Sequence, residues 1–521
     1  MRLFVIALYF ISLAANLQSQ ILKQEYVFSN PVIVGDSQKK LIEIDGCLNK
    51  AINGYPLLPW RACNLVLPEG TQVERVEIIS HHAKTLNVEG IISPAGNVRP
   101  LSDYENREEP TPNEHVYSKS VYMGQNFEEI KYSVHYLNNT PVLMFGLCPI
   151  KYNPVESKLI YHNKIEVKVY GTVGTAPTAL TENDLFLLNS FIDNPHDLPK
   201  VSSTPNIDNK IDVLIVTSSA FADELNSLKV AYRARGKKSA IVTTEQINSL
   251  YQGVDLAEKI RNCIKYYYQS KRINFVVLGG DTEIIPTRKL RSSVQSSSVH
   301  TGDIPSDLYY SALDGNWDSN QNGIYGEPAE ADLLPELAIG RIPFSNTTEL
   351  NNFLSKITRY AFSPVIFDTN RPLLAGEHLW DNPLTWGAQY LDLIVGLHDD
   401  NGYTTQGIPP SDPYDSLYDR HQTWSATQLR NKINQGTSFI HHVGHANENY
   451  LMRFNKGDLT ETYFSTIDGI SHLNPLVYSH GCLAAAFDED ECIAERMILL
   501  PNFASGFVGN SRYGWFNEGQ T

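Results

Sequence analysis

The chain has 521 residues and a formal net charge of −16 at pH 7, with 42% hydrophobic and 10% aromatic residues. This length is enough for at least two folded domains, and the hydrophobic content is that of a globular protein. The acidic balance argues against nucleic-acid binding, because phosphate recognition requires a basic surface.

The first residues are typical of a secretory signal peptide. Arg2 is followed by a mostly apolar run over residues 3–15, which stops at Asn16. A membrane-spanning helix needs about 20 apolar residues, so a membrane anchor is the weaker interpretation. We therefore expect residues 1–19 to be removed and the mature protein to be secreted or held at the cell surface, with no membrane-spanning segment.

Residues 20–171 contain short β-branched and aromatic runs separated by Gly, Pro, Asn and Asp. This alternation predicts an antiparallel β-sandwich. Within it, Cys47 and Cys63 flank a polar loop, and an exported chain can form disulfides, so we expect these two cysteines to be bridged. The six cysteines show no paired C-x-x-C spacing, which argues against a zinc site.

Residues 172–210 are rich in Thr, Pro, Asn and Asp and are predicted to connect two domains. Polar loops are favoured sites of proteolysis. An activating cleavage is therefore expected either here or in the charged stretch 103–114, and the sequence does not choose between them.

The pattern changes near residue 211, where apolar strands begin to alternate with helices. We expect strands at 211–217, 239–243 and 275–278, with helices at 221–235 and 255–269. Continuous apolar strands that alternate with helices predict a parallel sheet covered on both faces. Functional residues on such sheets lie at the carboxyl ends of the strands.

Two strand ends in the last part of the chain carry a histidine and a cysteine. One apolar run ends in Gly444-His445 and the other in Gly481-Cys482. A nearby imidazole stabilises a thiolate, so adjacent strands would give the Cys–His pair that covalent acyl transfer needs. The alternative is that Cys482 is a small buried hydrophobic residue and His445 a turn residue. Spacing alone does not separate the two.

The loop at 314–327 places side-chain oxygens at every second residue and then turns on a glycine. Hard cations such as calcium favour this arrangement, and we expect a structural calcium ion here. The match to an EF-hand loop counted from Asp318 is incomplete, because Ala329 stands at the twelfth position. The alternative is a turn that needs no metal. The expected ligands are Asp314, Asn316, Asp318, Asn320, Asn322 and Glu327.

The strand ends Gly444-His445 and Gly481-Cys482, with the motif at 492–495, resemble the catalytic core of the gingipain-type cysteine peptidases. The segments 276–281, 284–286 and 339–343 extend the resemblance, which covers about residue 211 to the end. It implies a caspase-like fold with a mostly parallel sheet flanked by helices. Relatives carry further C-terminal elements, so we expect the chain to be truncated.

The same resemblance implies that the N-terminal β domain is a prodomain, which keeps the enzyme latent as an intramolecular inhibitor. A β accessory domain that helps folding or binds substrate is the competing interpretation.

The resemblance also implies roles for single residues. Cys482 is the expected nucleophile and His445 the proton carrier, with the backbone amides of Cys482 and Ala446 stabilising the oxyanion. Ala446 departs from the family, which usually has Gly after the histidine. Glu377, at a third strand end, is the candidate that orients the histidine.

Aromatic residues are expected to line the substrate pocket, and these are Trp515, Tyr513 and Trp386. Relatives that cleave after basic residues place an acid a little after the orienting glutamate. The matching stretch 382–389 contains no acid. We therefore expect an uncharged residue on the N-terminal side of the cleaved bond (P1), because a buried substrate charge would lack its partner.

We predict a secreted, latent cysteine endopeptidase that acts on protein or peptide substrates and has no organic cofactor. One alternative is an export-pathway sorting or transpeptidase-like protein of the same fold that uses the same thiol. Another is a non-catalytic, calcium-dependent binding protein in which Cys482 is structural.

Overall fold

The structure is a computed structural model, and it describes residues 19–102, 109–125, 130–174, 180, 182–198, 210–296, 298–381, 384–400 and 403–517. Three predictions fall partly outside these residues: the signal peptide up to residue 18, residues 103–108 of the charged stretch, and residues 382–383 of the specificity stretch. Among the described helices, none has the length and apolar composition that a bilayer crossing requires.

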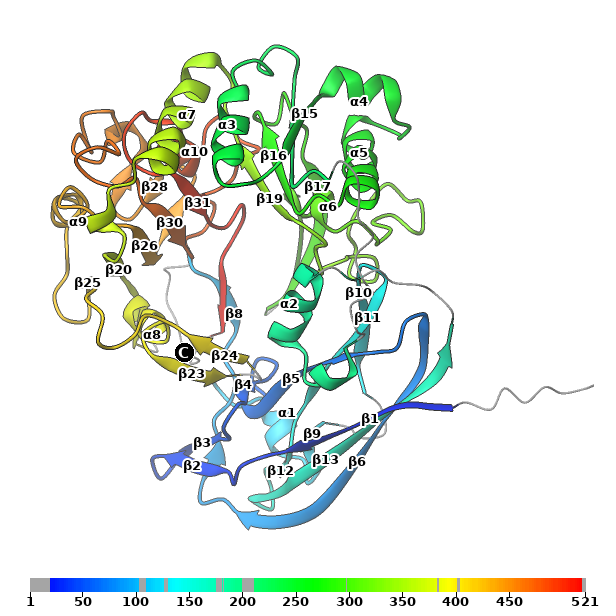
Figure 1. Ribbon diagram of the computed structural model, residues 1–521. Coiled ribbons are helices and arrows are strands. Elements are labelled where there is room, and N and C mark those ends of the chain that lie inside the picture. Colours follow the sequence, from blue (N-terminus) through cyan, green and yellow to red (C-terminus); the bar gives the residue numbers. More distant parts are fainter. Residues whose placement is uncertain are drawn as a thin grey trace, which may run out of the picture.

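The N-terminal part is built from antiparallel sheets, in the lower half of Figure 1. The first has the order β1-β13-β12-β9 with β6 also on β13, and the second has the order β10-β11-β5-β4. A small third sheet has the order β2-β3-β7. The strands are β1 Ser19–Val27, β2 Val32–Gly35, β3 Lys39–Glu43, β4 Leu48–Lys50, β5 Leu58–Val66, β6 Thr71–Asn87, β7 Ile91–Ile92, β9 Met123–Gly124, β10 Tyr132–Leu137, β11 Thr140–Leu147, β12 Ile150–Asn153 and β13 Lys158–Val173.

One apolar core lies between the two larger sheets. Leu65 and Leu143 from one sheet share it with Ile165 and Val167 from the other, and all four side chains are fully buried. The strands alternate because every second side chain faces this core. The predicted antiparallel sandwich is confirmed. The short helix α1 (Glu114–Tyr117) and strand β8 (Val98–Pro100) complete this part.

The predicted disulfide between Cys47 and Cys63 is wrong, because Cys63 has a free thiol. Its side chain is fully buried on β5, with Sγ 3.7 Å from the carbonyl oxygen of Arg61. Burial and the nearby Asp193 carboxylate raise the pKa of Cys63, which disfavours the thiolate that disulfide formation requires. The loop pattern in the sequence does not reveal that this strand position faces the core.

The stretch 172–210, predicted as a connection, contains helix α2 (Glu182–Phe191) and a short 3-10 turn (Pro195–Asp197). Leu188 of α2 packs against Val66 and Val142 of the β domain. Asn194 fixes the end of this stretch, because its side chain accepts from the Val66 amide and donates to the Val66 carbonyl, both at 2.9 Å. This part of the stretch therefore belongs to the packed structure.

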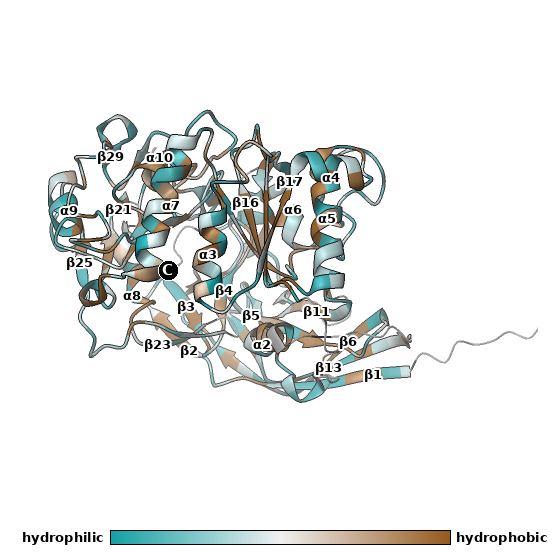
Figure 2. Ribbon diagram, turned by 45° about the horizontal axis from the view of Figure 1, so that its top comes forward, coloured by the Kyte–Doolittle hydropathy of each residue, from teal (hydrophilic) through white to brown (hydrophobic). Residues whose placement is uncertain are grey.

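The C-terminal part contains two parallel sheets rather than one. The first has the order β15-β14-β16-β19, and the second has the order β25-β20-β26-β30-β31. Figure 2 shows apolar strands such as β16 behind helices with polar outer faces. The strands are β14 Val213–Thr217, β15 Ser239–Thr243, β16 Phe275–Gly279, β19 Ala338–Ile342, β20 Pro372–Gly376, β25 Asp415–Tyr418, β26 Phe439–Val443, β30 Leu476–Ser479 and β31 Gly506–Val508.

Helices connect and cover these strands, as the alternating pattern predicts. Their starts are set by local capping: Asp255 caps α5 and Asn346 caps α7, each by accepting an amide hydrogen from the first turn. The helices are α3 Asn226–Ala234, α4 Thr244–Leu250, α5 Leu256–Lys271, α6 Leu308–Ser311, α7 Thr347–Phe362, α8 Gly387–Asp392, α9 Ala426–Ile433 and α10 Ile493–Leu499.

Hairpins and short turns complete the domain. They are β17 Arg288–Gln295 with β18 Val299–Ser306, β21 His378–Asp381 with β22 Leu384–Trp386, β23 Leu397–Asp400 with β24 Tyr403–Gln406, the ribbon β27 Ala446–Asn447, β28 Tyr450–Leu451 and β29 Phe454–Asn455, the 3-10 turns Ile366–Asp368 and Lys456–Asp458, and β32 Trp515–Asn517, which pairs with β8.

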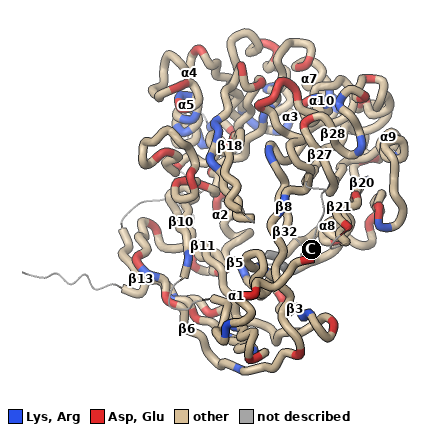
Figure 3. The backbone as a smooth tube through the Cα atoms, turned by 180° about the vertical axis from the view of Figure 1, so that it is seen from behind, with Lys and Arg blue, Asp and Glu red and all other residues tan. Residues whose placement is uncertain are grey.

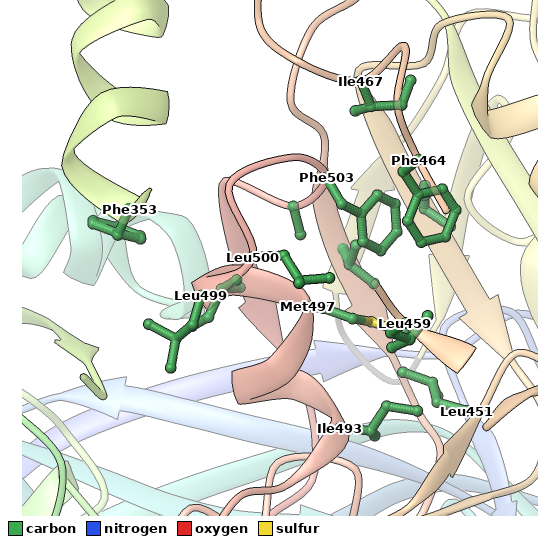
Figure 4. Close-up of a cluster of buried hydrophobic side chains, with 14 of the residues drawn as sticks. Phe353, Leu451, Leu459, Phe464, Ile467, Ile493, Met497, Leu499, Leu500 and Phe503 are labelled. Carbon is green, nitrogen blue, oxygen red and sulfur yellow. The ribbon is translucent and has the colours of Figure 1, made fainter. Parts of the chain in front are cut away.

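A shared hydrophobic core joins the two parallel sheets (Figure 4). Val213 and Ile215 of the first sheet belong to the same buried cluster as Ile440 and Val477 of the second. Around α10, the rings of Phe464 and Phe503 stack with centroids 3.9 Å apart. Each fully buried side chain of this size contributes roughly 1.5–3 kcal/mol, so this core fixes the second sheet on the first.

Candidate active site

Three neighbouring strands end at the same edge of the second sheet. Strand β26 pairs in parallel with β20 on one side and β30 on the other. Glu377 follows β20, His445 lies two positions after β26, and Cys482 lies three positions after β30. The ends of parallel strands coincide, so the sheet brings these residues to one edge. All three are buried.

The turns that carry His445 and Cys482 are in direct contact. A Cβ atom added at Gly481 would lie 2.4 Å from the Cβ of Ala446, so only glycine fits beside the His445 turn. Gly444 has a similar role, because a Cβ there would lie 2.5 Å from the Glu377 carboxyl carbon. The two glycines that precede His445 and Cys482 therefore allow the strand ends to approach each other.

Cys482 lies on a strained turn. The next residue, Leu483, has a φ of 59°, a left-handed conformation that non-glycine residues rarely adopt. Hydrogen bonds from the amides of Leu483 and Ala485 to the carbonyls of Arg512 and Asn510, at 2.8 and 3.0 Å, hold this turn. The Cys482 thiol is 3.7 Å from the carbonyl oxygen of Gly514.

His445 contacts the N-terminal domain directly. Its Nδ1–H donates to the backbone carbonyl of Leu101 at 2.6 Å, and its backbone amide donates to Glu377 Oε2 at 3.0 Å. Burial lowers the pKa of His445, and the Glu377 charge and the Leu101 carbonyl only partly oppose this effect. The imidazole is therefore more easily kept neutral than that of an exposed histidine.

Glu377 reaches His445 through the backbone amide. One of its oxygens, Oε1, lies 3.4 Å from Nε2 of His442 and 3.7 Å from Nε of Arg453. Burial alone would raise the pKa of Glu377, but the contacts with His442, the His445 amide and Arg453 lower it overall. Glu377 is thus a buried carboxylate that holds the turn of His445.

A buried chain of side chains continues from Glu377 to the turn of Cys482. His442 Nδ1 is 2.9 Å from Ser479 Oγ, and Ser479 Oγ accepts a hydrogen bond from the amide of Gly481 at 3.0 Å. His442 and Ser479 are almost completely buried. The sequence analysis did not assign these residues, although their place on strands next to the two turns was the available signal.

The three aromatic residues predicted for the pocket lie in two different hollows. Trp515 and Tyr513 line a cavity of about 740 Å³ with residues of the hairpin β17–β18. Trp386 lines a separate hollow of about 520 Å³ together with Glu377 and His445. The propeptide residue Leu101 contacts the site between the elements that form them.

The predicted metal ligands separate into two groups. Asn320 and Asn322 donate side-chain hydrogen bonds to Glu327 at 3.0 and 2.8 Å, while Asp318 accepts from the amides of Asn322 and Gly323. The Asn316 side chain accepts from the Asp318 amide. This exposed group is hydrogen-bonded to itself.

Asp314 lies elsewhere, with the buried residues Asp332 and Glu336, and one oxygen from each of the three carboxylates lies within 4.8 Å of the others. Burial, together with the Asp314 charge, raises the pKa of Asp332 to about 7 and that of Glu336 to about 9. Asp314 Oδ1 is buried and has no hydrogen-bond partner among the described residues. Three convergent oxygens with one orphaned atom fit a hard cation such as calcium.

Several motif residues from the sequence analysis hold the scaffold. Arg341 of β19 binds Asp307 through two hydrogen bonds of 2.8 and 2.7 Å and donates to the carbonyls of Gly280 and Ile285. Glu495 accepts from the Cys492 amide at the start of α10, and burial raises its pKa to about 8. These residues join neighbouring elements and do not contact the Cys482 turn through any of these bonds.

Comparisons with known proteins place the chain in a group. It is 26% identical over 321 residues to an uncharacterized protein of Archaeoglobus fulgidus, covering 56% of this chain and 70% of that protein. A structure of the Arg-specific cysteine proteinase gingipain R is 16% identical, with a TM-score of 0.43, covering 60% of this chain and 65% of that one. The complex of the pro- and mature domains of RgpB from Porphyromonas gingivalis is 16% identical, with a TM-score of 0.42, covering 58% and 64%.

The chain therefore spans a little under two thirds of each of these solved chains. The model described as Propeptide_C25 matches residues 19–189, which include the antiparallel sheets and most of α2. The model described as Peptidase family C25 matches residues 206–521, more than half of the chain, and these residues include both parallel sheets and the edge that carries His445 and Cys482. The protein thus belongs to the gingipain-type cysteine peptidases of family C25, which are made with an N-terminal propeptide.

Proposed function

We propose that the protein is a secreted, latent cysteine endopeptidase in which Cys482 is the nucleophile and His445 carries the proton. The observation that supports this most is the contact between the two strand ends, with a propeptide backbone segment against both. Leu101 accepts from His445 Nδ1, and its amide donates at 2.8 Å to the Gly514 carbonyl that also lies next to the Cys482 thiol.

The proposed reaction has two steps. His445 takes the thiol proton of Cys482, the sulfur bonds to the substrate carbonyl carbon, and the peptide C–N bond breaks as the imidazolium returns the proton to the leaving amine. Water then hydrolyses the thioester. The amides of Cys482 and Ala446 are proposed to stabilise the oxyanion, an effect of roughly 3 kcal/mol per donor in other enzymes.

The propeptide segment at 98–101 is proposed to be the inhibitory element. It lies along β32 in an antiparallel pairing that joins Trp515 to Pro100 and Asn517 to Val98, and Figure 1 shows the red C-terminal strand beside the light-blue β8. The Ser296 hydroxyl of the hairpin β17–β18 donates to the Val98 carbonyl at 2.5 Å. Because this segment covers Cys482, which is fully buried, substrate is excluded until the propeptide leaves.

Calcium is proposed as a structural cofactor of the loop at 314–327. Asp314 would hold it with Asp332 and Glu336, and the bound cation would neutralise three buried carboxylates. The exposed oxygens of Asp318, Asn320, Asn322 and Glu327 form a second possible ligand group next to it, with Asn316 adjacent. Secretion is proposed from the leader at residues 1–19.

Cysteine substitutions test the proposed reaction. Cys482→Ala should lower casein hydrolysis by at least about a thousandfold while the circular dichroism and melting temperature stay close to wild type. Cys492→Ala is the matched control, because Cys492 is also fully buried and follows Cys482 by a short loop. Loss of activity in the Cys492 variant together with its retention in the Cys482 variant would refute the assignment.

Alkylation gives a second measurement. After release of the propeptide, iodoacetamide should label Cys482 in preference to Cys492, whose pKa is raised by burial. His445→Ala should slow the labelling of Cys482. Equal labelling rates with and without His445 would argue that the imidazole does not activate the thiol.

A further inference from the structure

We propose that the apolar site holding the Leu101 side chain is the P1 pocket, and that the active enzyme cleaves after an aliphatic residue of about the size of leucine. This inference rests on the proposed function, because it assigns the substrate class of the same site. It is carried by the backbone, the side chain and the charges around Leu101.

The backbone of the segment 98–101 is bound as an added edge strand. Three successive residues pair with Trp515–Asn517, and the Leu101 amide continues the ladder to the Gly514 carbonyl at 2.8 Å. Extended peptides bind sheet edges in this way, with affinity from the main chain and selectivity from side-chain pockets. The carbonyl of Leu101 is the one that His445 contacts, so Leu101 stands at the position nearest to the dyad.

The side chain of Leu101 is fully buried in a cluster that otherwise belongs to the peptidase domain. Among the described residues, it is the one propeptide member of this cluster. Its partners come from β20, β21, α8, β25 and β26, together with the Cys482 turn, and they are Leu374, Leu379, Trp380, Ala388, Leu391, Tyr418, Val443 and Cys482. A pocket lined by such groups gains free energy from an aliphatic side chain in proportion to the apolar area that it buries.

The carboxylates nearest to this site are already engaged or point to solvent. Glu377 is held by the His445 amide, His442 and Arg453, and Asp419 is held by Arg453 and by the amides of His378 and Trp424.

The two acids on either side of the specificity stretch give the same result. Asp392, at the end of α8, forms two hydrogen bonds with Arg420, at 2.6 and 3.1 Å. The Asp381 side chain is 96% exposed. A lysine or arginine side chain in the place of Leu101 would therefore enter an apolar site without an available counterion among the described residues, which is strongly unfavourable.

Peptides that copy the bound segment test this proposal. The substrates are acetyl-Val-Arg-Pro-X-aminomethylcoumarin, in which X is Leu, Met, Ala, Asp, Lys or Arg. The enzyme is the wild-type full chain after limited proteolysis between the domains and release of the propeptide. We expect kcat/KM for Leu to exceed that for Ala by at least about tenfold and that for Lys, Arg or Asp by about a hundredfold.

The outcomes separate this inference from the proposed function. If X = Lys or Arg is cleaved at least as fast as X = Leu, the P1 assignment is overturned while the peptidase stands. If none of the peptides and no casein is cleaved, and iodoacetamide fails to label Cys482, the proposed function itself is refuted.

Substitution of Leu101 provides a measurement on the uncleaved full chain. Leu101→Asp should raise basal peptidase activity by at least about tenfold, because the charged side chain cannot occupy the pocket. Leu101→Met is the matched control and should remain latent. An uncleaved Leu101→Asp protein that is as latent as Leu101→Met would overturn the assignment of this pocket.

Discussion

Ser479 joins the two halves of the candidate site with a single hydroxyl. Its oxygen contacts the ring of His442 and accepts from the amide of Gly481, next to Cys482. A buried polar group that loses its partner costs about 1–3 kcal/mol. Ser479 therefore acts as a positioning residue between the Glu377 network and the nucleophile turn.

Replacing Ser479 by Ala should lower the free energy of unfolding by about 1–3 kcal/mol, because the Gly481 amide and the His442 ring both lose a partner. We also expect a lower kcat with little change in KM, since the turn of Cys482 loses its support. Urea denaturation and steady-state kinetics measure these effects. Ser479→Thr keeps the hydroxyl and should restore part of kcat; a purely structural role would lower stability in Ser479→Ala without changing kcat.

The sequence contains enough information to find the residues at strand ends but not their partners across domains. Glu377, His445 and Cys482 each follow an apolar run, and the sheet does bring these three positions to one edge. The contact between His445 and Leu101 joins residues 344 positions apart, and it depends on how two folded domains dock. A local pattern carries no signal for such a contact.

At the scale of elements, the alternation of apolar strands and helices predicted the α/β region well, because each strand is buried on both faces. It did not predict two separate sheets, since the break depends on which strands pair. Helix α2 was missed because its flanking Thr, Pro and Asn residues are typical of a connection. The metal ligands were predicted along one loop, whereas Asp332 and Glu336 come from the segment that follows it.

The acidic group of Asp314, Asp332 and Glu336 makes stability depend on pH. Because the folded pKa values of Asp332 and Glu336 are raised, to about 7 and about 9, their contribution is fully present below the unfolded pKa near 4. It is lost as pH rises through the folded values, because buried carboxylates must then ionise. A bound cation removes this penalty, and it requires the ionised ligands.

We therefore expect calcium to raise the melting temperature more at pH 8.5 than at pH 5.5, because protonated carboxyls bind the cation poorly. Differential scanning fluorimetry with 5 mM calcium or with EDTA, at both pH values, measures this difference. Asp332→Asn should reduce the calcium effect at pH 8.5, whereas Asp318→Asn in the exposed group is the control. Equal melting curves with calcium and EDTA at pH 8.5 would contradict the proposed calcium site.

In the whole molecule, the propeptide contacts the peptidase domain at two separate places. One is the strand β8 along β32, and the other is the tip of the hairpin β10–β11. At that tip the amides of Asn138 and Asn139 donate to Glu336 and Asp314, at 3.4 and 3.0 Å. Figure 3 shows acidic and basic residues interspersed along the described chain, so no single charged face dominates the docking.

Because the contacts do not depend on the covalent connection, the propeptide should remain bound after a single cut between the domains. Latency then becomes dependent on concentration, since an intramolecular contact has been converted into a bimolecular one. We expect the specific activity of the nicked protein to rise on dilution. Activity assays across a hundredfold dilution, with size-exclusion chromatography, measure this release; a specific activity independent of dilution would contradict it.

The pairing of β8 with β32 also has a consequence for the order in which the molecule is made. Ribosomes deliver the N-terminal domain first, and domains generally fold as units during synthesis. The inhibitory strand is therefore already present when the last strand of the cleft leaves the ribosome, several hundred residues later. The peptidase can complete its cleft only against a strand that fills it, so the newborn chain passes through no stage in which a finished cleft is open to other proteins of the cell that makes it.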